Sequence, residues 1–81
     1  MTRGIPVDVQ DCSASAKCVY LLLDAEGAMP QQKIRSLTGL SEDTTRRALG
    51  ELVDVEAALE RPDPNDGRRQ RYVLTDALEV A

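Results

Sequence analysis

The chain has 81 residues, of which 42% are apolar and 30% are charged. This length allows one domain with a small core, and this composition excludes a disordered chain; the longest apolar run, Cys18 to Leu23, is too short to cross a bilayer. With 14 acidic and 10 basic residues the net charge is −4, which by itself argues against nucleic acid as a partner. Only the local distribution of charge can reverse that conclusion.

The cysteine and histidine content limits the metal binding and catalysis that can be expected of this chain. The chain has no His, and its two cysteines, Cys12 and Cys18, are six positions apart, which is not a metal-site spacing. A Cys or Ser nucleophile usually needs a His base, so we expect no metal, no cofactor and no enzymatic activity. Cys18 is interpreted as a small core residue and Cys12 as a loop thiol.

The N-terminal residues lack the apolar stretch of a signal peptide, so we expect a cytoplasmic protein. Residues 1–12 show no periodicity and are predicted to form a flexible arm. The ten basic residues are eight Arg and two Lys. An acidic surface poor in Lys suits a halophile with a high-salt cytoplasm, and a GC-rich genome produces the same preference for Arg.

Helical periodicity begins after Ser13. Apolar residues recur at helical spacing at Ala14, Cys18, Leu21, Leu22 and Ala25, with Val19 beside them. Ser13 can cap the start of this helix, and Gly27 stands where a helix would stop. We therefore predict a helix over residues 14–26 with these apolar side chains in the core.

A short second helix is predicted over residues 30–37. Pro30 suits the first turn, because its missing N–H would have no partner there. Ile34 and Leu37 share one face. Gly39 permits the left-handed residue that ends a helix.

A third helix is predicted over residues 42–54. Ser41 is its N-cap, and Glu42 and Asp43 lie in the first turn, where carboxylates interact favourably with the helix dipole. One stripe is apolar and consists of Leu40, Thr45, Ala48, Leu49 and Leu52. The opposite face carries Glu42, Asp43, Thr44, Arg46 and Arg47. Two helices joined by so short a turn with a Gly form a helix-turn-helix.

Two strands follow the helices. "ALERP" predicts a strand near residues 58–62, "DPNDG" is a turn cluster, and "RRQRYVLT" predicts a second strand over residues 68–75. The order helix, helix, helix, strand, turn, strand predicts an α+β, mostly α, winged helix-turn-helix over residues 13–76. Residues 77–81 are a C-terminal tail.

The second strand opens with three arginines in four residues, at the tip of the predicted hairpin. A winged helix places its third helix in the DNA major groove and its hairpin along the backbone or minor groove. A guanidinium binds phosphate through a bidentate fork or enters the negative potential of a narrow groove. Because charges more than about 8 Å apart are largely screened at physiological salt, distant carboxylates do not cancel this contact. The local pattern favours double-stranded DNA.

"LSEDTTRRALGEL" followed by "LERPDPNDGRRQRYVLT" resembles the DNA-binding half of MarR-type winged-helix transcription regulators. The family's wing has an Asp, a spacer and an Arg, then a strand ending in Leu-Thr. Here these residues are Asp66, Gly67, Arg68, Leu74 and Thr75. The resemblance covers about residues 14–76. It implies that Asp66 braces the wing through arginine contacts, that Arg68 reaches DNA, and that Arg47 matches the arginine of the recognition helix.

The sequence departs from the family in two places. Family members usually have long helices on both sides of this core, which form the dimer and help to enclose an effector pocket; none is predicted here, and the sequence identifies no effector. The family also usually has a Gly between the third helix and the first strand, whereas "VDVEAAL" has none. We therefore expect either an unusual turn near Glu56–Ala57 or a longer third helix.

The residues predicted to contact DNA are Gln31, Gln32, Thr44, Arg46, Arg47, Arg68 and Arg69. Other interpretations stay open. Arg47 could instead pair with Glu51 one turn later, and the wing arginines could pair with Glu60 and Asp63 across the hairpin.

The predicted function is a sequence-specific, double-stranded-DNA-binding transcription regulator, with residues 42–54 in the major groove and the wing near residues 62–69 on the backbone or minor groove. A homodimer is expected, because a single small module seldom reaches nanomolar affinity alone. The alternative is a winged-helix protein-interaction module in a larger transcription or chromatin assembly.

Overall fold

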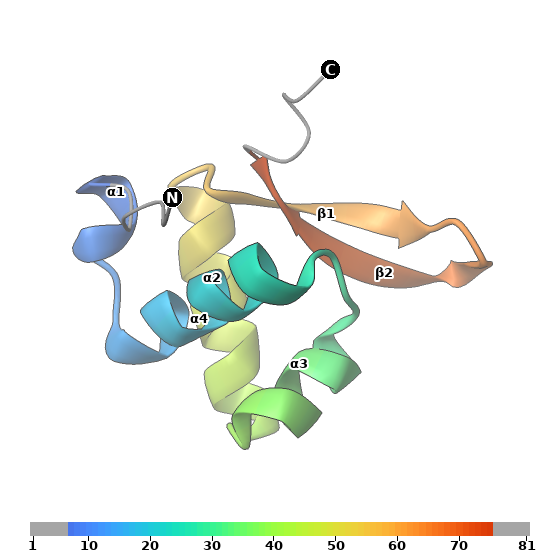
Figure 1. The fold of residues 1–81 in the computed structure, drawn as a ribbon, viewed down its shortest axis with the longest axis horizontal. Helices are drawn as coiled ribbons and strands as arrows, with labels where there is room; N and C mark the ends of the chain where they lie inside the picture. Colours follow the sequence, from blue (N-terminus) through green and yellow to red (C-terminus); the bar gives the residue numbers. More distant parts are fainter. Residues whose placement is uncertain (1–6, 76–81) are drawn as a thin grey trace.

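The computed structural model describes residues 7–75, except for the side chains of Val7 and Asp66. Within this range the elements are α1 (Val7–Gln10), α2 (Ala14–Glu26), α3 (Gln31–Thr38), α4 (Glu42–Asp54), β1 (Ala58–Asp63) and β2 (Asp66–Leu74) (Figure 1). The two strands form an antiparallel hairpin, and the predicted α+β, mostly α, winged helix is confirmed. Residues 1–6 of the expected arm and the expected tail over residues 77–81 lie outside the described residues.

The helix ends follow local signals in the sequence. Ser13 Oγ accepts the N–H of Ala16 at 3.2 Å, and Ser41 Oγ accepts the N–H of Thr44 at 3.2 Å, so both serines cap as predicted. Gly39, with φ 75°, ends α3 in the left-handed region that glycine adopts at no steric cost. Helix α3 starts one residue later than predicted, because Pro30 is its extended N-cap rather than part of the first turn.

The core lies between α2 and α4 and is closed by the base of the hairpin. Its large members from α4 are Leu49 and Leu52, and Ile34 is the buried residue of α3. Thr45 is also fully buried, and its hydroxyl donates to the carbonyl of Ser41 at 2.8 Å, so this polar atom is satisfied. The apolar stripe predicted for the third helix is confirmed. None of the helices in residues 7–75 is long and apolar enough to cross a membrane.

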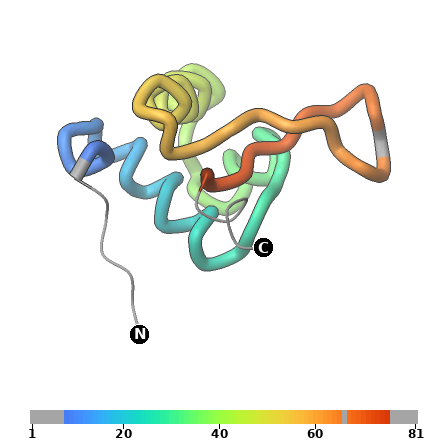
Figure 2. Tube along the Cα trace, turned by 90° about the horizontal axis from the view of Figure 1, so that it is seen from above, coloured from blue at the N-terminus to red at the C-terminus, as the bar shows by residue number. Residues whose placement is uncertain are grey.

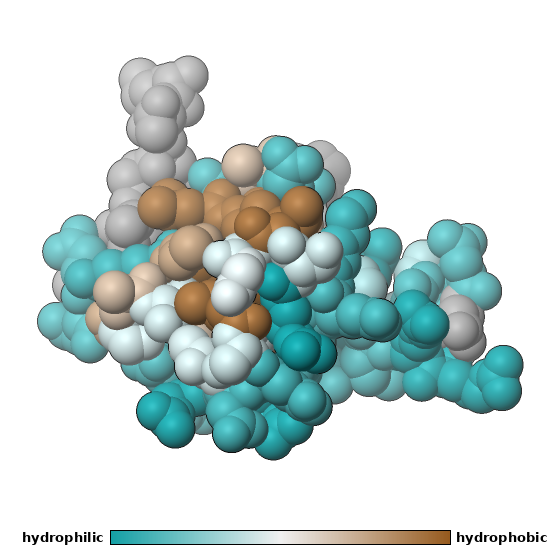
Figure 3. Space-filling model, turned by 90° about the horizontal axis from the view of Figure 1, so that it is seen from below, coloured by the Kyte–Doolittle hydropathy of each residue, from teal (hydrophilic) through white to brown (hydrophobic). Residues whose placement is uncertain are grey.

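The predicted buried face of α2 is right for Val19, and Leu22 is half-buried against the core, but it is wrong for the other predicted residues. The buried side chains are Ala16, Val19, Tyr20 and Leu23, whereas Cys18 is exposed and Leu21 keeps 47% of its surface in solvent. This helix is apolar on most sides, so periodicity cannot select the face that packs. Viewed from below Figure 1, apolar side chains form a band on the surface of the helical part, while the hairpin is hydrophilic (Figure 3).

Two further expectations about the core are corrected. Leu37 is 53% exposed, because the short helix α3 turns only Ile34 fully inward. The last part of the expected arm forms structure, because α1 buries Val9 completely. Cys12 lies in the short loop between α1 and α2, as predicted, and is half-buried against the core. Burial of an apolar side chain by tertiary contact stabilises the single helical turn of α1, which has no periodicity to announce it.

The hairpin extends away from the helices (Figure 2). Its strands pair from Ala58↔Leu74 outward to Pro62↔Gln70, and the register shifts between Pro62 and Asp63 near the turn. Both strands run further toward the turn than predicted. On its other edge β2 is held by Met29, because the Met29 N–H donates to the Tyr72 carbonyl at 3.2 Å and the Tyr72 N–H donates to the Met29 carbonyl at 2.9 Å.

Candidate nucleic-acid interface

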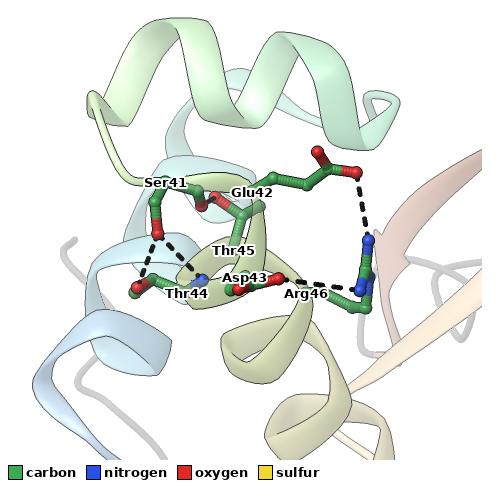
Figure 4. A network of polar contacts seen from close by, with 6 residues as sticks. All are labelled: Ser41, Glu42, Asp43, Thr44, Thr45 and Arg46. Atoms are coloured by element: carbon green, nitrogen blue, oxygen red, sulfur yellow. Dashed lines mark hydrogen bonds and ion pairs between the residues drawn. The ribbon is translucent and has the colours of Figure 1, made fainter.

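The N-terminal turn of α4 is organised by its cap (Figure 4). Besides accepting the N–H of Thr44, Ser41 Oγ donates to Thr44 Oγ1 at 2.9 Å. Thr44 is half-buried, and its hydroxyl is engaged with the cap. The Thr44 side chain can still offer a ligand its methyl group and the remaining lone pair of its hydroxyl oxygen.

Arg46 is held by two carboxylates from its own helix. Its Nη2 lies 3.0 Å from Glu42 Oε2, and its Nη1 lies 3.8 Å from Asp43 Oδ1 (Figure 4). The side chains of Arg46 and Glu42 are 63% and 57% exposed. Exposed pairs of this kind contribute about 0–1 kcal/mol each. They orient the guanidinium without fixing it, and a phosphate or a guanine edge can compete with them.

Arg47 lies on the same exposed face but does not pair with Glu51 as one interpretation suggested. The Glu51 carboxylate instead accepts the backbone N–H of Ser13 at 2.9 Å and its hydroxyl at 2.6 Å. These two hydrogen bonds, together with the more distant charge of Arg47, lower the pKa of Glu51. Arg47 is therefore left exposed beside Arg46 on α4.

The two glutamines of α3 lie in its first turn. Gln31 is half-buried and Gln32 is exposed, and α3 packs against both α4 and β2. The helix-turn-helix therefore carries its polar N-terminal residues on the surface. In helix-turn-helix proteins the first of the two helices crosses the phosphate backbone.

The wing places Arg68 and Arg69 on the exposed part of β2, directly after the turn. Both already take part in interactions within the protein. The carboxylate of Asp63, considered as a cross-hairpin partner, accepts the N–H of Asn65 at 2.8 Å and so shapes the turn. The backbone of Asp66 begins β2, but its side chain lies outside the described part, so its bracing role stays a prediction.

The Leu-Thr pair at the end of β2 anchors the base of the wing. Leu74 is buried in the core, and Thr75 Oγ1 donates to the Glu56 carbonyl at 2.6 Å while the Thr75 N–H donates to the Ala57 carbonyl at 2.9 Å. Glu56 has φ 60°, a left-handed conformation rare for a residue other than glycine. Of the two expectations for this segment, the unusual turn is confirmed, because α4 ends at Asp54.

Two wing arginines were not among the predicted contact residues. Arg61 and Arg71 face each other across the hairpin. The alternation of β2 places Arg71 on the face shared with Arg69, but its pairing with Arg61 depends on the strand register, which the sequence does not specify.

Among the described residues, no three His, Cys, Asp or Glu side chains are close enough to hold a metal ion.

Comparison with solved structures yields strong similarities. A probable transcriptional regulator from Pseudomonas aeruginosa superposes with a TM-score of 0.79 at 23% identity, over 86% of this chain and 53% of the other. The PcaV transcriptional regulator from Streptomyces coelicolor in complex with its natural ligand gives 0.75 at 26% identity, over 84% and 48%. A mutant MarR from E. coli complexed with operator DNA gives 0.74 at 20% identity, over 84% and 49%.

These similarities establish the architecture. The chain has the winged-helix fold of the DNA-binding part of MarR-type transcription regulators, which confirms the resemblance at the level of fold. It spans about half the length of the solved structures that it matches. No family model matches the sequence, and no curated protein is similar to it at a significant level.

Proposed function

We propose that this chain is a sequence-specific, double-stranded-DNA-binding transcription regulator. The observation that carries the proposal is the presence of exposed Arg46 and Arg47 on α4, together with an arginine-rich hairpin, in the fold of a MarR protein that was solved on operator DNA. Helix α4 would lie in the major groove, and the hairpin would lie along the backbone or in the minor groove.

Each predicted contact residue has a role that its position supports. Arg46 and Arg47 project from α4 and can reach a guanine edge or a phosphate, and Thr44 adds a short polar contact. Gln31 and Gln32 start α3 and would approach a phosphate. Arg68 and Arg69 would contact the backbone or minor groove, with Asp66 bracing the wing as the family resemblance implies.

Dimer formation is part of the proposal. One winged helix makes few base contacts, whereas two copies on half-sites about one helical turn apart combine their affinities. The face of α2 that carries Cys18 and Leu21 is apolar and exposed, and it is the surface that a second copy would cover. Sedimentation of the full chain alone and with a palindromic duplex tests this. A strict monomer under both conditions would contradict it.

Titration of the full chain into duplex DNA across a salt series tests the main proposal. Contacts to phosphate release counterions, so we expect log Kd to rise steeply and linearly with log salt, and a preferred duplex to bind far more tightly than a random one. The competing proposal is a protein-interaction module, which the net charge of −4 and the carboxylates of Glu42 and Asp43 beside Arg46 favour. Absence of salt-dependent DNA binding would select that alternative.

A further inference from the structure

Two arginines lie directly opposite each other in the wing. The register pairs Arg61 of β1 with Arg71 of β2, so both side chains project from the same face of the hairpin. The next pair toward the base of the hairpin is Leu59 and Val73, and the following residue of β2 on this face toward the turn is Arg69. Like charges directly opposite each other destabilise an antiparallel pair.

The hydrogen-bonding pattern of the hairpin determines the distance between the Cβ atoms of these two arginines. Tyr72 directs both its N–H and its carbonyl to Met29, which is on the edge of β2 away from β1. Because these directions alternate along a strand, Arg71 directs its backbone groups toward β1. Arg61 and Arg71 are therefore a hydrogen-bonded pair, whose Cβ atoms are separated by about 5.5 Å. With their Cβ atoms this close, the two guanidinium groups can contact the same small ligand.

The described side chains offer these two charges no ion-pair partner; the side chain of Asp66, at the start of β2, is not among them. Neither guanidinium has an ion pair or hydrogen bond with the described residues, and Arg71 Nε is enclosed by protein atoms without a partner. The nearby carboxylates are directed elsewhere. Glu60 alternates to the opposite face of β1, and Asp63 accepts the backbone N–H of Asn65. The unsatisfied Nε of Arg71 adds a desolvation cost to the repulsion between the two charges, and both exposed guanidinium ends keep N–H groups for a ligand.

We infer that Arg61 and Arg71 form a clamp for a phosphate group of the DNA backbone. A phosphate between the two side chains adds two attractions that outweigh the one repulsion, and each guanidinium can present two parallel N–H groups to its oxygens. The inference rests on the proposed function and extends it, because it adds the middle of the hairpin to the contact at the tip. Phosphate contacts position a protein on the duplex without reading sequence.

The clamp predicts opposite changes in stability and binding for one substitution. Arg61→Glu would place a carboxylate opposite Arg71, so the free protein should melt at a higher temperature than the wild type. The same variant should bind any duplex more weakly, because the phosphate site gains a negative charge. A structural role for Arg61 would instead lower the melting temperature.

Neutral variants isolate the anion site. In the full chain, Arg61→Gln and Arg71→Gln are compared with Lys17→Gln, which makes the same change in net charge in the first part of α2. Replacing chloride by inorganic phosphate at constant ionic strength should raise the melting temperature of the wild type and of Lys17→Gln. The rise should be clearly smaller in both arginine variants, which keep only the general stabilisation that phosphate gives to folded proteins. Equal rises in all four proteins would overturn the clamp.

The DNA measurement separates failure of the clamp from failure of the proposed function. Arg61→Gln should weaken specific and random duplexes alike, by about fivefold, and reduce the salt slope by about one. If the wild type binds duplex with a steep salt slope and Arg61→Gln matches Lys17→Gln, only the clamp is wrong. If the wild type binds no duplex, the proposed function fails and the assignment of DNA phosphate to this site fails with it.

Discussion

Ser13 donates both its backbone N–H and its hydroxyl to the carboxylate of Glu51, at 2.9 and 2.6 Å. Ser13 is also the N-cap of α2, so one residue of α4 completes the start of another helix 38 positions earlier in the chain. Glu51→Ala removes the acceptor and should destabilise the domain by about 1 kcal/mol, a figure kept low because the contact lies near the surface. Thermal unfolding should show a decrease of a few degrees, and Asp54→Ala, an exposed acid one turn later on α4, serves as control.

The same contact gives a pH dependence of defined sign. The hydrogen bonds from Ser13 lower the pKa of Glu51 below its ordinary value of 4.5. A lowered pKa means that the stabilisation is fully present above the unfolded value and is lost as pH falls through the folded value. Below pH 4.5 the stability difference between the wild type and Glu51→Ala should therefore shrink. A difference that stays constant down to the lowest pH at which both proteins fold would contradict this.

Glu42 restrains Arg46, so Glu42→Gln should release it. The substitution removes a negative charge from the proposed DNA-binding surface and weakens the 3.0 Å pair. We expect tighter binding to both preferred and random duplexes, by severalfold, with a small decrease in melting temperature because Glu42 also interacts favourably with the dipole of α4. Glu26→Gln, on the exposed end of α2, controls for net charge alone. Weaker binding by Glu42→Gln would mean that Glu42 reads a base itself.

Arg46 and Arg68 should have separable effects on DNA binding. Arg46→Ala should weaken the preferred site by about 1–3 kcal/mol while leaving random DNA nearly unaffected, because a guanine contact carries sequence information. Arg68→Ala should weaken both duplexes by similar factors and reduce the salt slope by about one. Both variants should be melted first to establish that they fold. The reverse result would mean that the two surfaces are assigned backwards.

Glu56→Gly should stabilise the domain. At φ 60° a residue with a Cβ costs about 1–2 kcal/mol, and glycine removes this cost while losing about 0.5–1 kcal/mol through its freer unfolded chain. The net gain is about 0.5–1 kcal/mol, which corresponds to a rise of several degrees in melting temperature. Glu56→Ala keeps the backbone strain and should give no such rise. A glycine variant that melts no higher than the alanine variant would disprove this explanation.

The two cysteines should differ in reactivity toward an alkylating reagent at mildly alkaline pH. Cys18 is exposed on α2, whereas burial and the nearby carboxylates of Glu51 and Asp11 raise the pKa of Cys12. Cys12 Sγ also donates to the Asp8 carbonyl at 3.6 Å. Because the thiolate is the reactive form, Cys18 should be modified first, as peptide mass mapping can establish. Cys18→Ser should remove the fast phase; loss of the slow phase instead would contradict the observed packing.

The local signals in the sequence determined where elements begin and end. Ser13 and Ser41 cap helices through their own side chains, and Gly39 adopts the left-handed conformation that ends α3. These effects act within four residues, so they can be read from neighbouring letters. The same holds for the turn cluster of the wing and for the arginines beside it. Fold class and the location of the proposed DNA-binding surface followed from such signals.

Tertiary packing decided what local signals leave open. Helix α2 is apolar on most sides, so its packing against α4, β2, α1 and α3 selects Val19 and Tyr20 for the core and leaves Cys18 outside. Val9 is buried because α1 packs against α2, whereas its own segment shows no periodicity that predicts a helix.

Strand register is the clearest case of a feature that only the tertiary structure decides. A shift of one residue would send Arg61 and Arg71 to different faces, and nothing in either strand alone specifies their pairing. The register is set by the burial of Leu74 and Ala58 in the core and by the hydrogen bonds of Met29 to the edge of β2 that faces away from β1. Hydrophobic burial at the base of the hairpin thus brings two like charges together farther out.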